Sequence, residues 1–182
     1  MIGQLAISIG CSRAPQTQTK VSTPSPSPSA TADSYPRLTI QAKELIDALL
    51  RKDLDRFIDL THPKVVELGG GREKMRATMK QQLEQTEAEG VVVLASSIGT
   101  PTQVIHDSGS IYVVMPNTLK VKAQAGTFQT ESTLIGVSGD NGVNWTFVDA
   151  SGKDDGELKK ILPGVADKLN VPTAKQPVKV VD

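Results

Sequence analysis

The stretch FQTESTLIGVSGDNGVNWTF, which covers Phe128–Phe147, decides the fold. Apolar and polar residues alternate on both sides of a glycine-rich segment, and this period of two is typical of β-strands. We expect one strand over residues 127–137, a turn over Gly139–Gly142 and a second strand over residues 143–148. These two strands form a hairpin, and the other predicted elements are arranged around it.

The residues before the hairpin continue the alternation. β-Branched residues are frequent in the segments 91–97, 102–106, 111–115 and 118–125. Turn residues separate these segments, among them Pro116-Asn117 and Ala125-Gly126. Because short connections force neighbouring strands to run in opposite directions, the sequence predicts an antiparallel sheet of about five to six strands.

The segment before the strands has a helical pattern. Apolar residues follow the helical spacing over residues 41–52, Asp53 can cap a second helix through Asp59, and Pro63 suits the first turn of a third. Residues 72–89 form a fourth helix that ends at Gly90. Helices followed by an antiparallel sheet are typical of the α+β class.

We therefore predict a single α+β domain over residues 36–170. Its N-terminal helices pack on one face of a curved sheet, which gives the domain the shape of a cone. Helical turns at residues 157–161 and 165–169 close the domain, and residues 171–182 are predicted to form a flexible tail.

Two turns fix the predicted register of the sheet. A loop at Ala125-Gly126 places Ala123 opposite Phe128, and a loop at Gly139–Gly142 places Gly136 opposite Trp145. The face predicted to meet the helices carries apolar residues and two hydroxyls: Leu119, Val121, Ala123, Phe128, Thr130, Ser132, Leu134, Trp145 and Phe147. The opposite face is predicted to lie in water and carries Lys120, Lys122, Gln129, Glu131, Asn144 and Thr146.

The N-terminal residues MIGQLAISIGC resemble a degraded or truncated bacterial lipoprotein signal over residues 1–11. In such a signal small residues precede the cysteine that is lipidated, and Gly10-Cys11 match the end of the motif. Residues 12–35 are rich in Ser, Thr and Pro and predict a disordered linker. The resemblance implies lipid attachment at Cys11 and a location at the bacterial cell envelope, facing the periplasm or the exterior. The alternative is an unstructured terminus with an incidental cysteine on a cytosolic domain.

Helices before a bent antiparallel sheet resemble the nuclear transport factor 2-like superfamily, a cystatin-like cone, over residues 36–152. The segments nearest to its pattern are the amphipathic helix with its acidic turn, Leu45–Asp59, and the last strand with Trp145-Thr-Phe147. Family members place a short strand before the last long helix, and only residues 64–67 could supply it here. The resemblance implies a pocket between sheet and helices, with Tyr112, Phe128, Thr130, Ser132 and Trp145 as candidate binding residues.

The turn of the hairpin resembles a second, local motif. Ser138-Gly-Asp140-Asn-Gly142-Val-Asn-Trp145 matches the Asp-box, S-x-D-x-G-x-x-W, of sialidase-type propellers and other secreted proteins. In such a turn Asp140 can accept backbone N–H bonds, Gly142 can take a positive φ and Trp145 can pack inside. The motif occurs once, so we predict a structural turn and not a repeated propeller blade.

Composition narrows the classes of function. The 20 basic residues balance the 20 acidic residues and aromatic residues make up 3%, which disfavours nucleic acid as a partner. One cysteine and two histidines are few ligands for a metal, and we expect neither metal nor cofactor. The sequence has no apolar run of the length that spans a bilayer, so membrane contact is expected only through the lipid anchor.

We therefore expect a non-catalytic ligand-binding or protein-interaction domain. Its partner is a small apolar ligand or an envelope protein, and the chain is a monomer or a homodimer. The alternative is a small enzyme of the isomerase or dehydratase type that uses the cone pocket, with Tyr112 and His62 or His106 moving protons. Each histidine is predicted to cap a helix or support a loop, and no residue is assigned a catalytic role.

Overall fold

The computed structural model describes residues 35–173 and 175–180, so Cys11 and the predicted linker up to residue 34 lie outside the described part of the chain. The helices at the start of the domain are α1 (Pro36–Leu50), α2 (Leu54–Leu60), α3 (Pro63–Leu68) and α4 (Arg72–Ala88). The strands that follow are β1 (Val92–Ile98), β2 (Gln103–Asp107), β3 (Ser110–Ala123), β4 (Gly126–Ser138) and β5 (Thr146–Asp149). The remaining elements are α5 (Asp155–Ile161), the 3-10 helix η2 (Ala166–Lys168) and β6 (Val178–Val180).

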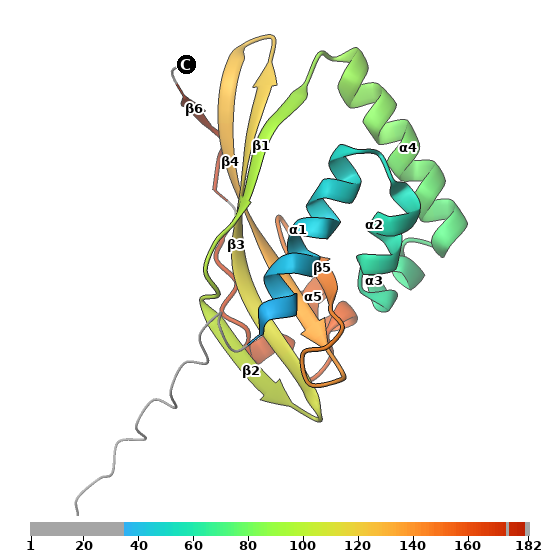
Figure 1. Ribbon diagram of the computed structural model, residues 1–182, viewed down its shortest axis with the longest axis vertical. Helices are drawn as coiled ribbons and strands as arrows, with labels where there is room; N and C mark the ends of the chain where they lie inside the picture. The colour runs from blue at the N-terminus through green and yellow to red at the C-terminus, as the bar shows by residue number, and fades with distance from the viewer. Residues whose placement is uncertain (1–34, 174, 181–182) are drawn as a thin grey trace, which may run out of the picture.

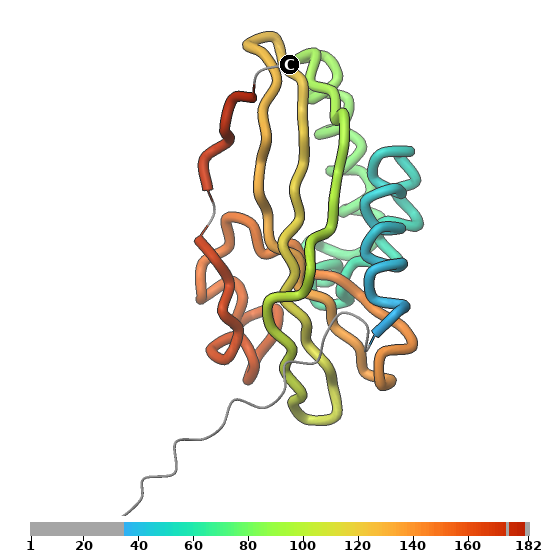
Figure 2. Tube along the Cα trace, turned by 60° about the vertical axis from the view of Figure 1, so that its left-hand side comes forward, coloured from blue at the N-terminus to red at the C-terminus, as the bar shows by residue number. Residues whose placement is uncertain are grey.

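The strands form one antiparallel sheet of six strands, and the fold class is α+β as predicted. The order is β1-β3-β4-β5, with β2 also beside β3 and β6 also beside β4. Figure 1 shows α1 to α4 on one side of this open sheet, and Figure 2 shows β1 and β6 on its two borders. We call the end with the β3–β4 turn the upper half and the end with the β2–β3 turn the lower half.

Helices α2 and α3 begin where the sequence predicts them, whereas α1 begins earlier. Pro36 occupies the first turn of α1, which starts five residues earlier than the spacing of apolar residues predicts. The Asp53 side chain accepts a hydrogen bond from the Arg56 N–H at 3.1 Å and caps α2. His62 caps α3 through Nδ1, which accepts from the Lys64 N–H at 3.2 Å. The capping prediction for this histidine is therefore confirmed.

The turn predicted at Pro116-Asn117 is wrong, because both residues lie inside β3, which runs unbroken for 14 residues. Strand β2 pairs with the first part of β3 and β1 pairs with the part from Asn117 onward. Pro116 lies where the neighbouring strand changes, and its carbonyl accepts from the Gly99 N–H at 2.8 Å. A proline is tolerated here because its nitrogen points to the gap between β2 and β1. No strand lies there to accept a hydrogen bond from a backbone N–H, so its absence costs nothing.

The predicted register is wrong by two residues in both hairpins. Ala123 pairs with Gly126 and not with Phe128, and Gly136 pairs with Phe147 and not with Trp145. A shift of two residues keeps every side chain on its face, whereas a shift of one would exchange the faces. For this reason the prediction that Leu134 and Phe147 share the side covered by the helices is confirmed.

The residues predicted for the wet face of the sheet are exposed or partly exposed, but the prediction is wrong for the lower half of that face. In its lower half, Ile135 and Val148 are fully buried under a second core formed with α5 and the segment after it. That core contains Ala150, Leu158, Ile161, Leu162, Val165 and Ala166. Two apolar layers therefore enclose the lower half of the sheet, one on each face.

The C-terminal segment that the sequence predicts as a tail contains β6, whose residues pair with Thr127–Gln129 of β4. Residues 64–67, the only candidates for a short strand before the last long helix, lie in α3 instead. Thr61, just before that helix, forms an isolated parallel bridge with Phe147, and the His62 N–H donates to the Phe147 carbonyl at 2.9 Å. The helical layer is thereby joined to β5 by backbone hydrogen bonding.

Candidate functional site

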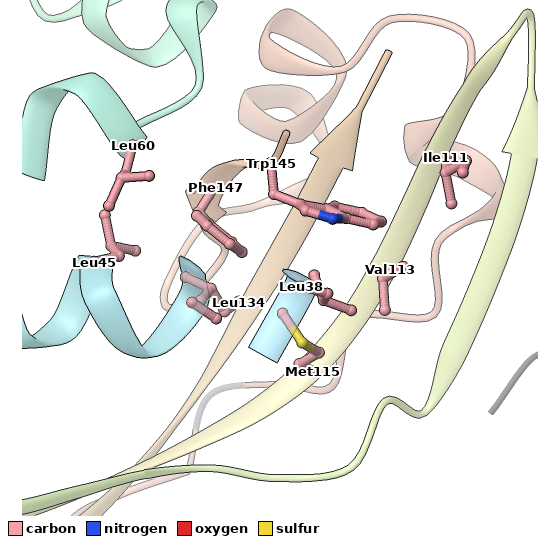
Figure 3. Packing of buried hydrophobic residues seen from close by; sticks show 10 residues of the cluster. Leu38, Leu45, Leu60, Ile111, Val113, Met115, Leu134, Trp145 and Phe147 are labelled. Carbon is pink, nitrogen blue, oxygen red and sulfur yellow. The ribbon is translucent and has the colours of Figure 1, made fainter. Parts of the chain in front are cut away.

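The lower half of the space between the helices and the sheet is a closed core. Trp145 is 2% exposed, and its indole lies among Leu38 of α1, Val113 and Met115 of β3, and Phe147 of β5 (Figure 3). A Cβ at Gly136 would lie 2.8 Å from Leu38 Cδ1, so only glycine lets α1 and the indole approach the sheet this closely. Trp145, which the family resemblance places in a pocket, is thus part of the packed interior.

The Asp-box segment forms the structural turn that the sequence predicts. The Asp140 carboxylate accepts from the Ser138 hydroxyl at 2.8 Å, from the Asn144 N–H at 2.8 Å and from the Asn144 side-chain amide at 2.7 Å. These bonds, with the backbone bond from Asn144 first, lower the pKa of Asp140. The Trp145 indole N–H donates to the Gly142 carbonyl at 3.0 Å, which ties the turn to the core.

Gln41 of α1 connects this turn to the helical layer. Its side-chain oxygen accepts from the Trp145 N–H at 2.8 Å, and its side-chain nitrogen donates to the Val143 carbonyl at 3.2 Å. Gln41 is 9% exposed, so both bonds lie in a region that water reaches poorly. The turn between β4 and β5 is therefore fixed to α1 from two sides, and it supports the fold without presenting reactive groups.

The upper half of the same sheet face is apolar but only partly buried. Leu119, Val121, Phe128 and Thr130 share the side of Leu134, and all four have intermediate exposure. We call these four residues the upper sheet face. Two of the predicted binding residues, Phe128 and Thr130, belong to it.

A row of polar side chains crosses the sheet at the lower border of the upper sheet face. The Ser96 hydroxyl donates to Asn117 Oδ1 at 3.2 Å, and Asn117 Nδ2 donates to the Ser132 hydroxyl at 3.0 Å. Asn117 is 4% exposed, so its amide needs these partners. The sequence predicts Ser132 as a binding residue but neither Asn117 nor Ser96. Asn117 follows a proline and therefore resembles a turn residue.

Helix α4 carries a second apolar surface that is only partly buried. Its stripe consists of Met75, Met79 and Leu83, each with intermediate exposure, and no residue of α4 is buried. The helix packs against α2 and α3, and Figure 1 shows it on the outside of the helical layer. We call these three residues the α4 stripe.

Ion pairs join α4 to the helices beside it. Arg72 donates to Asp59 at 2.6 Å and to Asp55 at 3.1 Å, and Arg76 lies 3.4 Å from Asp55. Lys52, which follows α1, pairs with Glu87 near the other end of α4. A groove of about 630 Å³ lies between α4 and the α1–α2 junction, and its lining includes Lys52, Asp55, Arg76 and Glu87 of these pairs and Leu83 of the α4 stripe. This groove is lined mostly by charged residues, whereas the family resemblance implies an apolar pocket.

The titratable residues considered for proton transfer lie on separate parts of the fold. Tyr112 faces the second core on the far side of the sheet, so its predicted place in the cone pocket is wrong. His106 Nε2 lies 3.1 Å from the Tyr35 hydroxyl at the lower end of the domain. Burial lowers the pKa of His62, which caps α3. These groups do not meet at one site.

Two other kinds of feature are absent from the described residues. They contain no group of three or more His, Cys, Asp or Glu side chains placed to hold a metal ion. No helix among them has the length and apolar character needed to cross a membrane. Comparison of the chain with models of protein families, with curated proteins and with solved structures finds no match.

Proposed function

We propose that the chain is a non-catalytic binding domain whose ligand or protein partner docks between the upper sheet face and the α4 stripe. The observation that carries this proposal is the incomplete burial of both surfaces. Phe128 and its neighbours on the sheet lie partly exposed, while directly below them the same face is completely buried. Met79 and Leu83 on α4 are also partly exposed. An apolar partner would gain free energy by covering both surfaces.

The chemistry of the sheet favours an apolar molecule with a polar end. Leu119, Val121 and Phe128 provide the apolar contact area, whereas Thr130 and the Ser96–Asn117–Ser132 row offer hydroxyl and amide groups at one border. Binding sites commonly combine a mostly apolar lining with a few polar groups that orient the ligand. No residue of the upper sheet face or of the α4 stripe has a titratable side chain, and this favours binding over the isomerase or dehydratase alternative.

The family resemblance to the nuclear transport factor 2-like superfamily is part of the same proposal. The order of helices and strands agrees with it, and the Thr61–Phe147 bridge lies before the last long helix, where family members place a short strand. In this proposal the upper sheet face corresponds to the mouth of the cone. The closed lower core is then the narrow end.

We further propose that the domain is tethered to the bacterial cell envelope by a lipid on Cys11 and a Ser/Thr/Pro-rich linker. Tyr35, the first described residue, packs against Trp145 with ring centroids 5.5 Å apart and bonds to His106. The chain thus enters the domain at the lower end, where the core is closed. Such an attachment leaves the upper sheet face accessible to a partner.

Native mass spectrometry of the protein extracted from its own membrane tests the binding proposal. Wild-type protein is expected to carry a bound ligand or partner, and Phe128→Ser is expected to lose it because the largest apolar group of the upper sheet face is removed. The matched control is Val178→Ser on β6, which removes an exposed apolar side chain that pairs with Gln129 and lies on the other face of the sheet. Absence of any bound species on the wild type, or its retention by Phe128→Ser, would count against the proposal.

Labelling of cells with radioactive palmitate tests the tether separately. We expect label on the wild-type chain and none on Cys11→Ser. Equal labelling of both chains, or none of either, would remove the lipid anchor from the proposal and leave the binding test unaffected.

A further inference from the structure

The outer edge of β1 is the least protected part of the sheet. Strand β1 ends the strand order, so one of its edges has no strand beside it in the described part of the chain (Figure 2). Its first four residues, Val92 to Ala95, are exposed, and the exposed fractions of Val92, Val93 and Leu94 are 55%, 37% and 49%. An uncovered edge strand presents backbone N–H and C=O groups that can pair with another strand.

The other borders of the described sheet carry features that discourage pairing. Strand β6 has only three residues, one of which is Lys179, and β5 is short and bridges to Thr61. The side chain of Gln103 in β2 bonds to the backbone of Lys168 and Asn170, which brings the C-terminal segment against that strand. By contrast, β1 has the sequence VVLASSI and contains neither charge nor proline. Its one protective feature is an irregularity of register between Val93 and Ala95.

We propose that β1 pairs edge to edge with β1 of a second copy of this chain, in antiparallel orientation about a two-fold axis near Ala95. Pairing centred there places Val92 of one copy opposite Ile98 of the other, so the apolar ends of the strand meet each other. Ala95 of one copy lies opposite Ala95 of the other at the axis, and Leu94 lies beside it, opposite Ser96 of the other copy. The surface is self-complementary, as a two-fold interface requires.

Charge favours a second copy over a charged peptide as the occupant of this edge. A basic or acidic partner would need opposite charges on β1, and the strand has none. The whole chain has 20 basic and 20 acidic residues, so two copies approach each other without net repulsion. A single pair of seven-residue strands is about 23 Å long, and one strand edge of this length buries less area than the roughly 800 Å² per partner of a typical stable interface. The dimer is therefore expected to be weak and dependent on concentration.

Sedimentation velocity of the full chain from about 1 to about 200 µM tests the proposal, since interfaces of this size give micromolar affinities. All proteins carry Cys11→Ser, which prevents dimers linked through the single cysteine. We expect a reversible monomer–dimer equilibrium. Leu94→Lys is expected to raise the dissociation constant by about tenfold or more, because it introduces two like charges at each interface. Val178→Lys, at the opposite border, is the matched control and should leave the equilibrium unchanged.

A second measurement keeps the test independent of the effect of Leu94→Lys on stability. In the Cys11→Ser background, Ala95→Cys places the two introduced thiols, one from each copy, opposite each other at the proposed axis. This variant should form a disulfide-linked dimer on mild oxidation. The same substitution at Val178 should not. A monomer at every concentration overturns the proposal, and so does a dimer that survives Leu94→Lys or cross-links only through position 178. Pairing of β1 with an extended peptide while the protein stays monomeric also overturns it.

Discussion

Replacement of Gln41 by alanine is expected to weaken the attachment of the β4–β5 turn to α1. The substitution removes two hydrogen bonds. One runs from the Trp145 backbone N–H to the Gln41 side-chain oxygen at 2.8 Å, and the other from the Gln41 side-chain nitrogen to the Val143 carbonyl at 3.2 Å. Trp145 is 2% exposed, so its backbone N–H would be left without a partner, at a cost of about 1–3 kcal/mol. Val143 is 46% exposed and its carbonyl can turn to water, so the second bond contributes only about 0.5–1.5 kcal/mol.

The expected loss for Gln41→Ala is therefore about 2–4 kcal/mol in the free energy of unfolding. For a chain of 182 residues this corresponds to a decrease in Tm of about 5–15 °C. Urea unfolding can be followed by the fluorescence of Trp145, the single tryptophan of the chain. Because its indole is buried beside the affected bond, the signal reports on this region directly.

The matched control for this experiment is Gln85→Ala. Gln85 also lies in a helix and also donates a side-chain hydrogen bond, to Glu89 at 3.0 Å, but it is exposed. Its replacement should change the free energy of unfolding by no more than about 0.5 kcal/mol. A loss of the same small size for Gln41→Ala would refute the view that Gln41 holds the turn.

Three further substitutions test other parts of the structure. Gly136→Ala should cost about 1–3 kcal/mol in urea unfolding, since the new Cβ would lie 3.2 Å from Trp145 Cε3 in a packed core; a neutral effect would contradict the packing described here. Arg72→Met should accelerate hydrogen exchange in α4, because it breaks the ion pairs that join this helix to α2, and Lys80→Met, whose partner lies within α4, should not; equal exchange in both variants would contradict this role. His62→Asn keeps a cap for α3 but removes a half-buried imidazole whose pKa lies below the ordinary 6.5. The wild type should lose stability as the pH falls below 6.5, because the unfolded chain binds the proton more readily, and the variant should lose less; parallel profiles would show that this imidazole does not contribute.

The sequence was sufficient to predict the class of fold and most elements. Short-range signals such as the Asp53 cap, Pro63 and Gly90 set the helix boundaries, and each acts over only a few residues. The alternation of apolar residues assigned Leu134 and Phe147 to the correct face even though the register was wrong by two residues. Periodicity determines the face of a residue, whereas the position of the turn determines its partner.

The errors have physical causes that lie outside the local sequence. Pro116 resembles a turn residue until one knows that β3 exchanges its neighbour there. The second core could not be predicted, because Ile135 and Val148 become buried only when α5 folds back across the sheet. The exposure of the residues at the candidate site also could not be predicted from the local sequence. Phe128 and Trp145 share one face of the sheet, yet only the arrangement of the helices determines that one is partly exposed and the other buried.

The central claim is that the upper sheet face is a binding surface. Photo-crosslinking in the native cell tests it most directly, with benzoylphenylalanine placed at Phe128 and, as the control, at Val178. We expect a defined covalent adduct at position 128 and little or none at position 178, which pairs with Gln129 on the adjacent strand and therefore lies on the other face of the sheet. An adduct yield at position 128 no higher than at position 178 would contradict the claim.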